Sequence, residues 1–598
     1  MTPTAEQKVC LERFQTGRKL KIGAYAGTGK TSTLSLLAKG TRRTGTYLAF
    51  NRSIATEAGK KFPNTIACST QHALAFRAMV KDYDAKKMTG SVNGGYLAAR
   101  LNLQRLRINK DVSLTERGMG WLIGATVKRW CGSGDNDIGS HHMPVEGKLV
   151  TLSPGELALL REQVVRAALN LWTMMEDPKS DMPMGHDGYL KLWALGKPSI
   201  AGDFILLDEA QDTNGVILEL MRHQSAQLIC VGDRHQQIYE WRGARNAMVE
   251  LPAELEARLS TSFRFGTAIA GYASGILELL GETVPLTGNP DKPGFVTNDA
   301  IVKPNAILCR NNGRLLEQLL ASLERGERPA VVGGTTEVLN YVRAAESLMA
   351  GRSVDHPLDF FGFKDWSEVK VVSEFEDGAP ELRRWVKLFE DHDIGRLRSA
   401  LEGLPKDESS ADVVFSTAHK SKGREWSLVR LSDDLLQGVK VEKDSEKPDG
   451  GLRRMLGADK APLLPPMPED HAAELRLLYV ACTRGERQLE VPPLLAEKLA
   501  QLTGRPRPKL ATVPDSAIAV PVGVPVGVGV VPNGAMAAKV KRNKKRVKEL
   551  REYLRELVLP ELEVRLRDDP DELARVRSVI AKADETLAKL GDDVLARM

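Results

Sequence analysis

KIGAYAGTGKTS, from Lys21 to Ser32, joins a short apolar run to the start of a helical pattern. A strand, a glycine-containing turn and a helix in this order are the setting of a phosphate-binding loop. The glycines let backbone N–H groups approach phosphate oxygens, and the N-terminus of the helix adds a favourable dipole. Such loops usually open with a glycine, and Ala24 occupies that position here. Even so, Gly-Lys-Thr after a strand predicts a nucleotide site.

The residues of this loop have distinct expected tasks. Lys30 can reach the β- and γ-phosphates, and the hydroxyl of Thr31 can bind Mg²⁺. The nucleotide is expected to be held by the whole loop, which consists of Ala26, Gly27, Thr28, Gly29, Lys30, Thr31 and Ser32.

A second element carries acidic residues at the end of a buried strand. FILLDEAQD, residues 204–212, runs from an apolar stretch into Asp208 and Glu209. An aspartate in this place can bind Mg²⁺, and the adjacent glutamate can orient or deprotonate the attacking water. The two elements together predict a nucleoside triphosphatase.

Two series of short apolar runs alternate with helical patterns, which is typical of parallel α/β domains. The first series contains KLKIGAY, GTYLAF, DFILLD and QLICVG, and the second contains NAILC, PAVVG, DVVFST, LVRLS and RQLEV. A mostly helical stretch interrupts the first series, and a shorter one interrupts the second. We therefore predict a first domain at 1–76 and 200–255 with an insertion at 77–199, and a second domain at 256–344 and 406–500 with an insertion at 345–405.

The C-terminal part of the chain has a different composition. Residues 501–538 are rich in Pro, Gly and Val, which predicts an extended linker. Residues 539–598 begin with the basic run KVKRNKKRVK and continue with apolar residues at alternating spacings of three and four. This spacing predicts a coiled coil or helical hairpin that binds a protein partner or a second copy of the chain. The basic run is equally compatible with a solvated helix face and with nucleic-acid contact.

Composition narrows the class of protein. The 598 residues carry a net charge of +6, which is compatible with a polyanionic partner. The six cysteines are far apart, and neither they nor His141 and His142 have the spacing of a disulfide framework or zinc site. The start of the chain is polar, and the longest apolar stretch, 517–531, is rich in Pro and Gly. We therefore expect a cytoplasmic protein without a membrane partner.

The motifs follow one another in an order typical of one helicase family. GAYAGTGKT, LLDEAQD and VGDRHQQIYEWRGA resemble the superfamily I DNA helicases of the UvrD/Rep/PcrA group. Further similar stretches follow in the family's order: TAEQ, LAFNRSIATEA, STQHALAF, LSTSFRF, ILCRNN, VVFSTAHKSKGREW and ELRLLYVACTRGERQL. The resemblance covers residues 4 to about 492. AFNRSIATEA and PMGHDGYLKLWAL resemble the F-box DNA helicase branch, although no F-box precedes the first motif.

The resemblance implies that ATP and Mg²⁺ lie between two RecA-like domains. Gln7 would read the adenine, Phe263 would stack on it, and Glu425 would contact the ribose. Gln236 would sense the γ-phosphate, which Asp233 would help to position. The implied catalytic set, in which two arginines of the second domain reach the γ-phosphate, is Lys30, Asp208, Glu209, Gln236, Arg264 and Arg484.

The same resemblance implies a path for single-stranded DNA across both domains. Aromatic side chains on this path would stack on bases of any sequence, which contributes about 1–3 kcal/mol per base. The implied DNA-binding residues are Phe50, Asn51, His72, Tyr239, Trp241, Arg242 and His419.

The function implied is an ATP-dependent translocase on single-stranded DNA and a helicase on tailed duplex DNA, with 3′-to-5′ direction. Only about 100 residues separate ILCRNN from VVFSTAH, so the large insertion usual in this group is reduced or absent. An alternative is a remodelling factor that uses ATP to strip proteins from DNA with little strand separation. A nuclease fusion is disfavoured because no acid-acid-lysine cluster is recognised after residue 492. An ATP-gated clamp without catalysis is disfavoured because Lys30, Asp208, Glu209 and both arginines are present.

Overall fold

The computed structural model describes residues 2–503, apart from 241–242, 302, 375–379, 406, 438 and 440–468. The described residues belong to one unit, residues 1–513. Residues 501–503 end helix α20 (Pro493–Thr503). The rest of the predicted linker and the whole of the predicted 539–598 tail lie outside the described residues.

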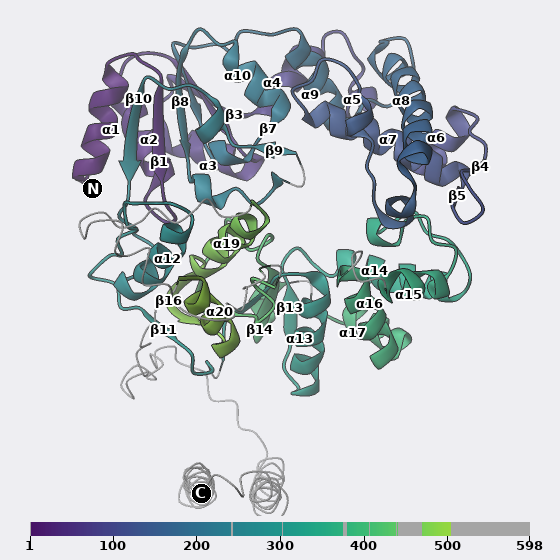
Figure 1. Ribbon diagram of the computed structural model, residues 1–598. Coiled ribbons are helices and arrows are strands. Elements are labelled where there is room, and N and C mark those ends of the chain that lie inside the picture. Colours follow the sequence, from purple (N-terminus) through teal and green to yellow (C-terminus); the bar gives the residue numbers. More distant parts are fainter. Residues whose placement is uncertain are drawn as a thin grey trace, which may run out of the picture. The chain divides into compact units, whose positions relative to one another are not determined.

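The first sheet has six parallel strands in the order β10-β1-β8-β6-β2-β3 (Figure 1). The strands are β1 (Leu20–Ala24), β2 (Gly45–Ala49), β3 (Ile66–Thr70), β6 (Phe204–Leu207), β8 (Gln227–Gly232) and β10 (Leu255–Leu259). Helices α1 (Ala5–Gln15), α2 (Lys30–Lys39), α3 (Arg52–Lys61) and α10 (Gly215–Arg222) pack around it. Every residue of β6 and β8 is buried, which accounts for their continuous apolar runs.

The two outer strands of this sheet were not in the predicted series. β10 alternates buried and exposed residues, and β3 mixes them, because each has a neighbouring strand on one side only. The predicted boundary between residues 255 and 256 falls inside β10, which pairs with β1 through Leu20 and Leu255. The end of the first sheet therefore lies beyond the apolar runs that the sequence displays.

The second sheet is also parallel, with the order β11-β16-β15-β12-β14-β13. Its strands are β11 (Phe295–Thr297), β12 (Ala306–Cys309), β13 (Pro329–Val331), β14 (Val413–Thr417), β15 (Trp426–Leu431) and β16 (Gly485–Glu490). Helices α12 (Thr267–Leu279), α13 (Asn312–Glu324), α19 (Glu469–Cys482) and α20 belong to this domain. The predicted α/β class with two parallel sheets and helical insertions is confirmed for the described residues.

The first insertion (residues 77–199) is mostly helical. It contains α5 (Ala85–Thr89), α6 (Gly94–Arg100), α7 (Glu116–Gly132), α8 (Pro154–Glu176), α9 (Gly185–Leu195) and the short strands β4 (Leu106–Arg107) and β5 (Ser113–Leu114), and α4 (Gln71–Met79) leads into it. The longest helix, α8, starts with a capping box between Ser153 and Glu156. A Cβ at Gly120 would lie 2.2 Å from the carbonyl oxygen of Gly94, so α6 and α7 pack backbone against backbone.

The second insertion (residues 345–405) is a smaller helical body. α14 (Thr336–Met349) leads into it, and α15 (Trp366–Glu374), α16 (Pro380–Asp391) and α17 (Ile394–Glu402) complete it. Its core is aromatic: the rings of Tyr341 and Trp385 stack with centroids 4.3 Å apart. This core is continuous with β12 and β14 through Ile307 and Phe415. Among the described residues, no helix has the length and apolar character that crossing a membrane requires.

Candidate functional site

The loop between β1 and α2 has room only for glycine at position 27. Gly27 has φ of +73°, and a Cβ there would lie 2.5 Å from Ser262 Oγ and 2.6 Å from Arg264 Cβ. Gly29 also has positive φ, and Lys30 begins α2 directly after it. The backbone of the loop is therefore bent and laid close to the segment that follows β10, as a phosphate-binding cradle requires.

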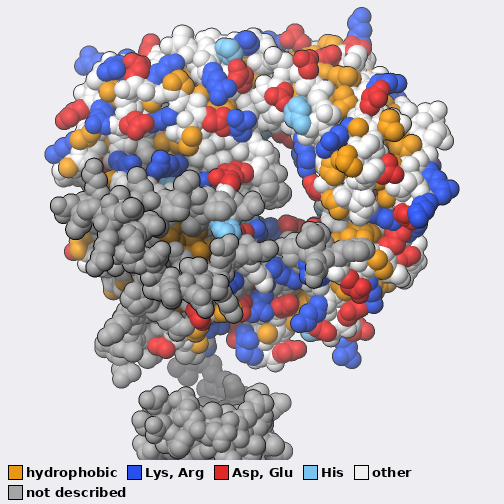
Figure 2. All heavy atoms as spheres, in the orientation of Figure 1, with side chains coloured by type: hydrophobic (Ala, Val, Ile, Leu, Met, Phe, Trp, Pro, Cys, Tyr) orange, Lys and Arg blue, Asp and Glu red, His pale blue; other side chains and the backbone are white. Residues whose placement is uncertain are grey.

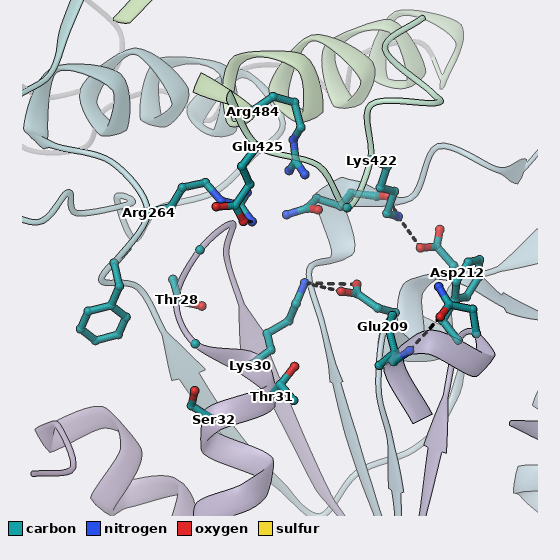
Figure 3. A pocket seen from close by; sticks show the side chains of 18 of the residues that line it. Thr28, Lys30, Thr31, Ser32, Glu209, Asp212, Arg264, Lys422, Glu425 and Arg484 are labelled. Atoms are coloured by element: carbon teal, nitrogen blue, oxygen red, sulfur yellow. Dashed lines mark hydrogen bonds and ion pairs between the residues drawn. The ribbon is translucent and has the colours of Figure 1, made fainter. Parts of the chain in front are cut away.

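This loop forms one wall of a cavity of about 490 Å³ between the two α/β domains. The residues that line the cavity are Gly27, Thr28, Gly29, Lys30, Thr31, Ser32, Phe50, Asn51, Ile54, Glu209, Asp212, Gln236, Tyr239, Phe263, Arg264, Lys422, Gly423, Glu425 and Arg484. Figure 3 shows Arg264, Glu425 and Arg484 lying across the cavity from Thr28 and Lys30. Most of the residues predicted for the nucleotide therefore meet at one place.

Lys30 and Glu209 form an ion pair at the floor of the cavity, with the Lys30 Nζ 3.1 Å from the carboxylate. Burial acts to lower the pKa of Lys30, but the carboxylates of Glu209, Asp233 and Asp208 outweigh it and raise this pKa. Burial acts to raise the pKa of Glu209, but Lys30 and then Lys422 outweigh it and lower this pKa. Glu209 is therefore ionised, as a base that receives a proton must be.

Asp208 is held behind this pair and is not among the residues that line the cavity. The hydroxyl of Tyr47 donates to its carboxylate at 2.6 Å, and the N–H of Glu209 donates to its other oxygen at 2.9 Å. Burial, followed by the charge of Glu209, raises the pKa of Asp208. Glu209 itself has the left-handed backbone conformation, with φ of 49°, which is uncommon for a residue with a side chain.

A buried polar network connects this floor to the second domain. Gln211 donates to Glu209 at 2.6 Å and accepts the N–H of Asp233 at 3.1 Å. Asp233 in turn accepts hydrogen bonds from the side chain of Gln236 at 2.9 Å and from the hydroxyl of Tyr479 at 2.8 Å. Neither Tyr479 nor Gln211 was predicted from the sequence, although both lie inside quoted motifs.

Lys422 of the second domain also reaches the first domain. Its Nζ bonds to the carboxylate of Asp212 and donates to the backbone carbonyl of Gln236 at 2.5 Å. Burial raises the pKa of Asp212 to about 6, against the charge of Lys422. Neither residue was predicted, although KSKGREW and DEAQD contain them, because nothing in one sequence pairs two residues so far apart.

Two arginines with different hydrogen-bond partners complete the cavity wall. Arg264 pairs with Glu425 at 2.5 Å and donates to the carbonyl of Thr483 at 3.0 Å. Arg484 is 2% exposed and donates to the carbonyl of Val480 at 2.9 Å. Burial and then the charge of Arg264 lower the pKa of Arg484 to about 9. The carboxylate of Glu425 pairs with Arg264, and the printed partners of Arg484 are oxygens without formal charge, which suits a wall that receives an anion.

Comparisons with known proteins agree with this geometry. A family model described as the UvrD/REP helicase N-terminal domain matches residues 200–253. The chain is 29% identical over 523 residues to F-box DNA helicase protein 1 of Schizosaccharomyces pombe, which covers 81% of this chain and 57% of the relative. It is 29% identical over 536 residues to F-box DNA helicase 1 of Gallus gallus, which covers 83% of this chain and 49% of the relative.

The chain is therefore similar to the UvrD/REP helicases of superfamily I and to two DNA helicases. The two six-stranded parallel sheets fit the two RecA-like domains of such helicases, and the cavity lies between them. The chain spans about half the length of the curated relatives it matches.

The residues expected to contact the adenine base lie beside the phosphate loop. The side chain of Gln7 donates to Thr33 at 3.1 Å, in the first turn of α2. The ring of Phe263 is 44% exposed, and its nearest atom would lie 3.6 Å from a Cβ at Gly29. An exposed aromatic face next to the loop is suited to stacking on a purine.

The residues expected to bind DNA are divided by the structure. Phe50, Asn51 and Tyr239 line the same cavity as the phosphate loop. Tyr239 donates its hydroxyl to the carbonyl of His419 in the second domain at 2.9 Å. His72 lies instead against the first insertion, with its Nε2 3.4 Å from Asp187 of α9. The remaining two predicted residues, Trp241 and Arg242, lie outside the described residues.

The site fits a nucleoside triphosphate with Mg²⁺. The buried Nε of Arg264 and one carboxylate oxygen of Asp212 have no hydrogen-bond partner among the described residues, and both residues line the cavity. Thr31 presents its hydroxyl there, and Asp208, the other predicted Mg²⁺ ligand, is anchored one layer behind. Oxygen donors of this kind suit Mg²⁺, which keeps several waters and binds few protein groups directly.

His141, His142 and Asp135 also come together, and hydrogen bonding accounts for them. The N–H of Gly139 donates to Nδ1 of His142 at 2.9 Å, so a neutral His142 carries its proton on Nε2. That Nε2 lies 3.0 Å from the carboxylate of Asp135 and donates to it. Groups of the protein therefore lie within hydrogen-bond distance of both ring nitrogens of His142.

Proposed function

We propose that this chain is an ATP-dependent single-stranded DNA translocase and DNA helicase that hydrolyses ATP between its two RecA-like domains. The observation that carries the proposal is the composition of the cavity wall. One side is a phosphate loop with Lys30, and the other side brings Arg264 and Arg484 from a different domain. The printed names of the two relatives, both DNA helicases, support DNA as the polymer.

Hydrolysis on this site depends on charge neutralisation and positioning. Lys30, Arg264 and Arg484 stabilise the charge that develops on the transferred phosphoryl group. Glu209, held ionised by Lys30, accepts the proton of the attacking water. Bound Mg²⁺ supplies further charge neutralisation at the phosphates. Because the arginines and Lys30 belong to different domains, the complete site exists only when the domains are closed.

The nucleotide state reaches the DNA through the segment that contains Asp233, Gln236 and Tyr239. Gln236 lines the cavity, and Tyr239 contacts both the cavity and the second domain. We propose that bases stack on Tyr239 and Trp241 and that closure alters this grip, which moves the strand by alternating hold. The 3′-to-5′ direction, the use of tailed duplexes and a partner for the 539–598 tail rest on the resemblance and the sequence pattern alone.

The test is strand displacement from duplexes that carry a 3′ or a 5′ single-stranded tail, with Lys30→Ala as the inactive control. We expect release from the 3′-tailed duplex only, and none with the variant. Release from the 5′ tail only would reverse the proposed direction. No release from either, with ATP hydrolysis still stimulated by single strands, would favour a factor that strips proteins from DNA.

A further inference from the structure

The two insertions, which belong to different RecA-like domains, touch each other. Lys148 of the first insertion pairs with Glu368 of the second, with Nζ 2.7 Å from the carboxylate. The backbone N–H of Lys148 donates to the carbonyl of Phe361 at 2.9 Å. The Lys148 side chain is only 8% exposed. Loss of either partner of a buried, hydrogen-bonded ion pair would leave an uncompensated charge, which is destabilising. The ion pair therefore makes this a specific contact between the two insertions.

An apolar anchor accompanies the ion pair. Phe361 belongs to the second insertion by sequence, yet it is 1% exposed and lies in the hydrophobic core of the first insertion. Its ring packs on Trp121 of α7 with centroids 4.8 Å apart. A second ion pair, between Arg117 and Asp355 at 2.7 Å, lies beside it. We call this set of contacts the clasp.

The clasp completes a closed circuit of protein that consists of the two RecA-like domains and their two insertions. The first insertion shares one core with the first sheet, through Leu207 and Leu228, and the second insertion shares one with the second sheet, through Ile307 and Phe415. The two RecA-like domains meet where Tyr479 contacts Asp233. Figure 2 shows that side chains do not fill the centre of this circuit, which lies between α7, α9, β9 (Ala244–Arg245) and α14 of Figure 1.

Two segments expected to hold DNA lie next to elements that border this opening. β9 directly follows the segment of Tyr239 and Trp241. His72, at the start of α4, contacts Asp187 of α9. A strand held at these two places would lie beside the opening.

We propose that this chain encloses single-stranded DNA in a closed loop of protein whose gate is the clasp. The inference rests on the proposed function. It adds that strands with and without free ends enter the protein by different routes. A strand with a free end can thread through the closed circuit, whereas a circle without ends enters only when the clasp opens. The clasp is a short contact between two helical bodies, so its opening leaves both RecA-like domains folded.

Covalent closure of the clasp tests this directly. Arg117→Cys and Asp355→Cys are introduced into a Cys68→Ser background, because the other five cysteines are buried. Linking the two thiols with bis-maleimidoethane makes a covalent loop from residue 117 to residue 355, which passes through both RecA-like domains. The full-length protein is linked before or after incubation with circular single-stranded DNA, and the complexes are then denatured in SDS.

We expect circular DNA to stay with the protein in SDS when linking follows loading, and linear DNA of the same length to be released. Linking before loading should abolish capture of circles and their stimulation of ATP hydrolysis, while linear strands still stimulate it. The matched control links Arg18→Cys to Glu254→Cys, an exposed pair 3.0 Å apart within the first RecA-like domain, and should trap nothing.

Three results would overturn the proposal: release of circles in SDS despite efficient linking, stimulation by circles after prior linking, or failure of the clasp pair to link where the control pair links. The proposed function is judged separately by the unlinked protein. If linear single strands do not stimulate its ATP hydrolysis, the motor activity itself is absent.

Discussion

The hydroxyl of Tyr479 in the second RecA-like domain donates a hydrogen bond to Asp233 in the first at 2.8 Å. The same oxygen accepts the N–H of Ala26 in the phosphate loop at 3.1 Å. Tyr479 is fully buried, and burial followed by the charge of Asp233 raises its pKa well above its ordinary value. One neutral hydroxyl therefore joins the loop, the segment that leads to Tyr239 and the second domain.

Tyr479→Phe should weaken the coupling between the domains without removing the nucleotide site. The change leaves the buried N–H of Ala26 without its acceptor, which costs about 1–3 kcal/mol. We expect kcat of DNA-stimulated ATP hydrolysis to fall about tenfold, the effect of ~1.4 kcal/mol on a barrier, with KM for ATP nearly unchanged. Steady-state kinetics with and without single-stranded DNA measure this. An unchanged kcat with a raised KM would show that the contact serves binding instead.

Lys422→Ala should change the pH dependence of hydrolysis. Lys422 is one of the two charges that lower the pKa of Glu209. Its removal raises that pKa, so the acid limb of kcat against pH should move to higher pH. Lys420→Ala is the matched control, because Lys420 pairs with Glu337 at 2.8 Å and does not line the cavity. Superimposable profiles for wild type and Lys422→Ala would contradict the assigned role.

Arg264→Ala should affect chemistry more than nucleotide binding. Arg264 reaches the cavity from the second domain, as an arginine finger supplied in cis does. Loss of such a residue lowers kcat by about 10³-fold or more. Single-turnover hydrolysis and equilibrium binding of a non-hydrolysable ATP analogue separate the two effects. Arg328→Ala, which removes an exposed ion pair with Asp412, should leave both unchanged.

Glu282 should make the fold sensitive to acid. Its carboxylate lies 2.9 Å from His235, 2.7 Å from Arg234 and 3.0 Å from Arg258. Burial acts to raise its pKa, but the hydrogen bond with His235 and then the charge of Arg234 outweigh burial and lower this pKa from 4.5 to about 2. Since the folded pKa is below the unfolded one, this stabilisation is present above about pH 4.5 and is lost as the pH falls towards 2. The difference corresponds to about 3 kcal/mol of unfolding free energy.

Denaturant unfolding of Glu282→Gln between pH 7 and pH 3 measures this contribution. The variant should be less stable than wild type at pH 7, and the difference should shrink as the pH falls. Glu254→Gln, which alters the exposed pair with Arg18, should show little change at any pH. A difference that grows towards low pH would refute the assignment.

Contiguous patterns were enough to predict the α/β class and the phosphate loop. A buried parallel strand needs apolar residues in succession, and the phosphate loop needs Gly27, Gly29 and Lys30 at set intervals. Both features can therefore be recognised from residues that are neighbours in the sequence. Most of the nucleotide residues named from motifs also meet in one cavity, although their individual roles stay predictions. The outer strands β3 and β10 were not recognised, because strands with one neighbour tolerate polar residues.

Tertiary structure alone decided which distant residues touch. Tyr479 and Asp233 are 246 positions apart, and Lys148 and Glu368 are 220 positions apart. No periodicity or propensity reports on such pairs, because each residue taken alone is an ordinary buried tyrosine or surface charge. Burial then changes their chemistry: the same lysine or carboxylate that is solvated in the unfolded chain becomes a gate or a domain link once water is excluded.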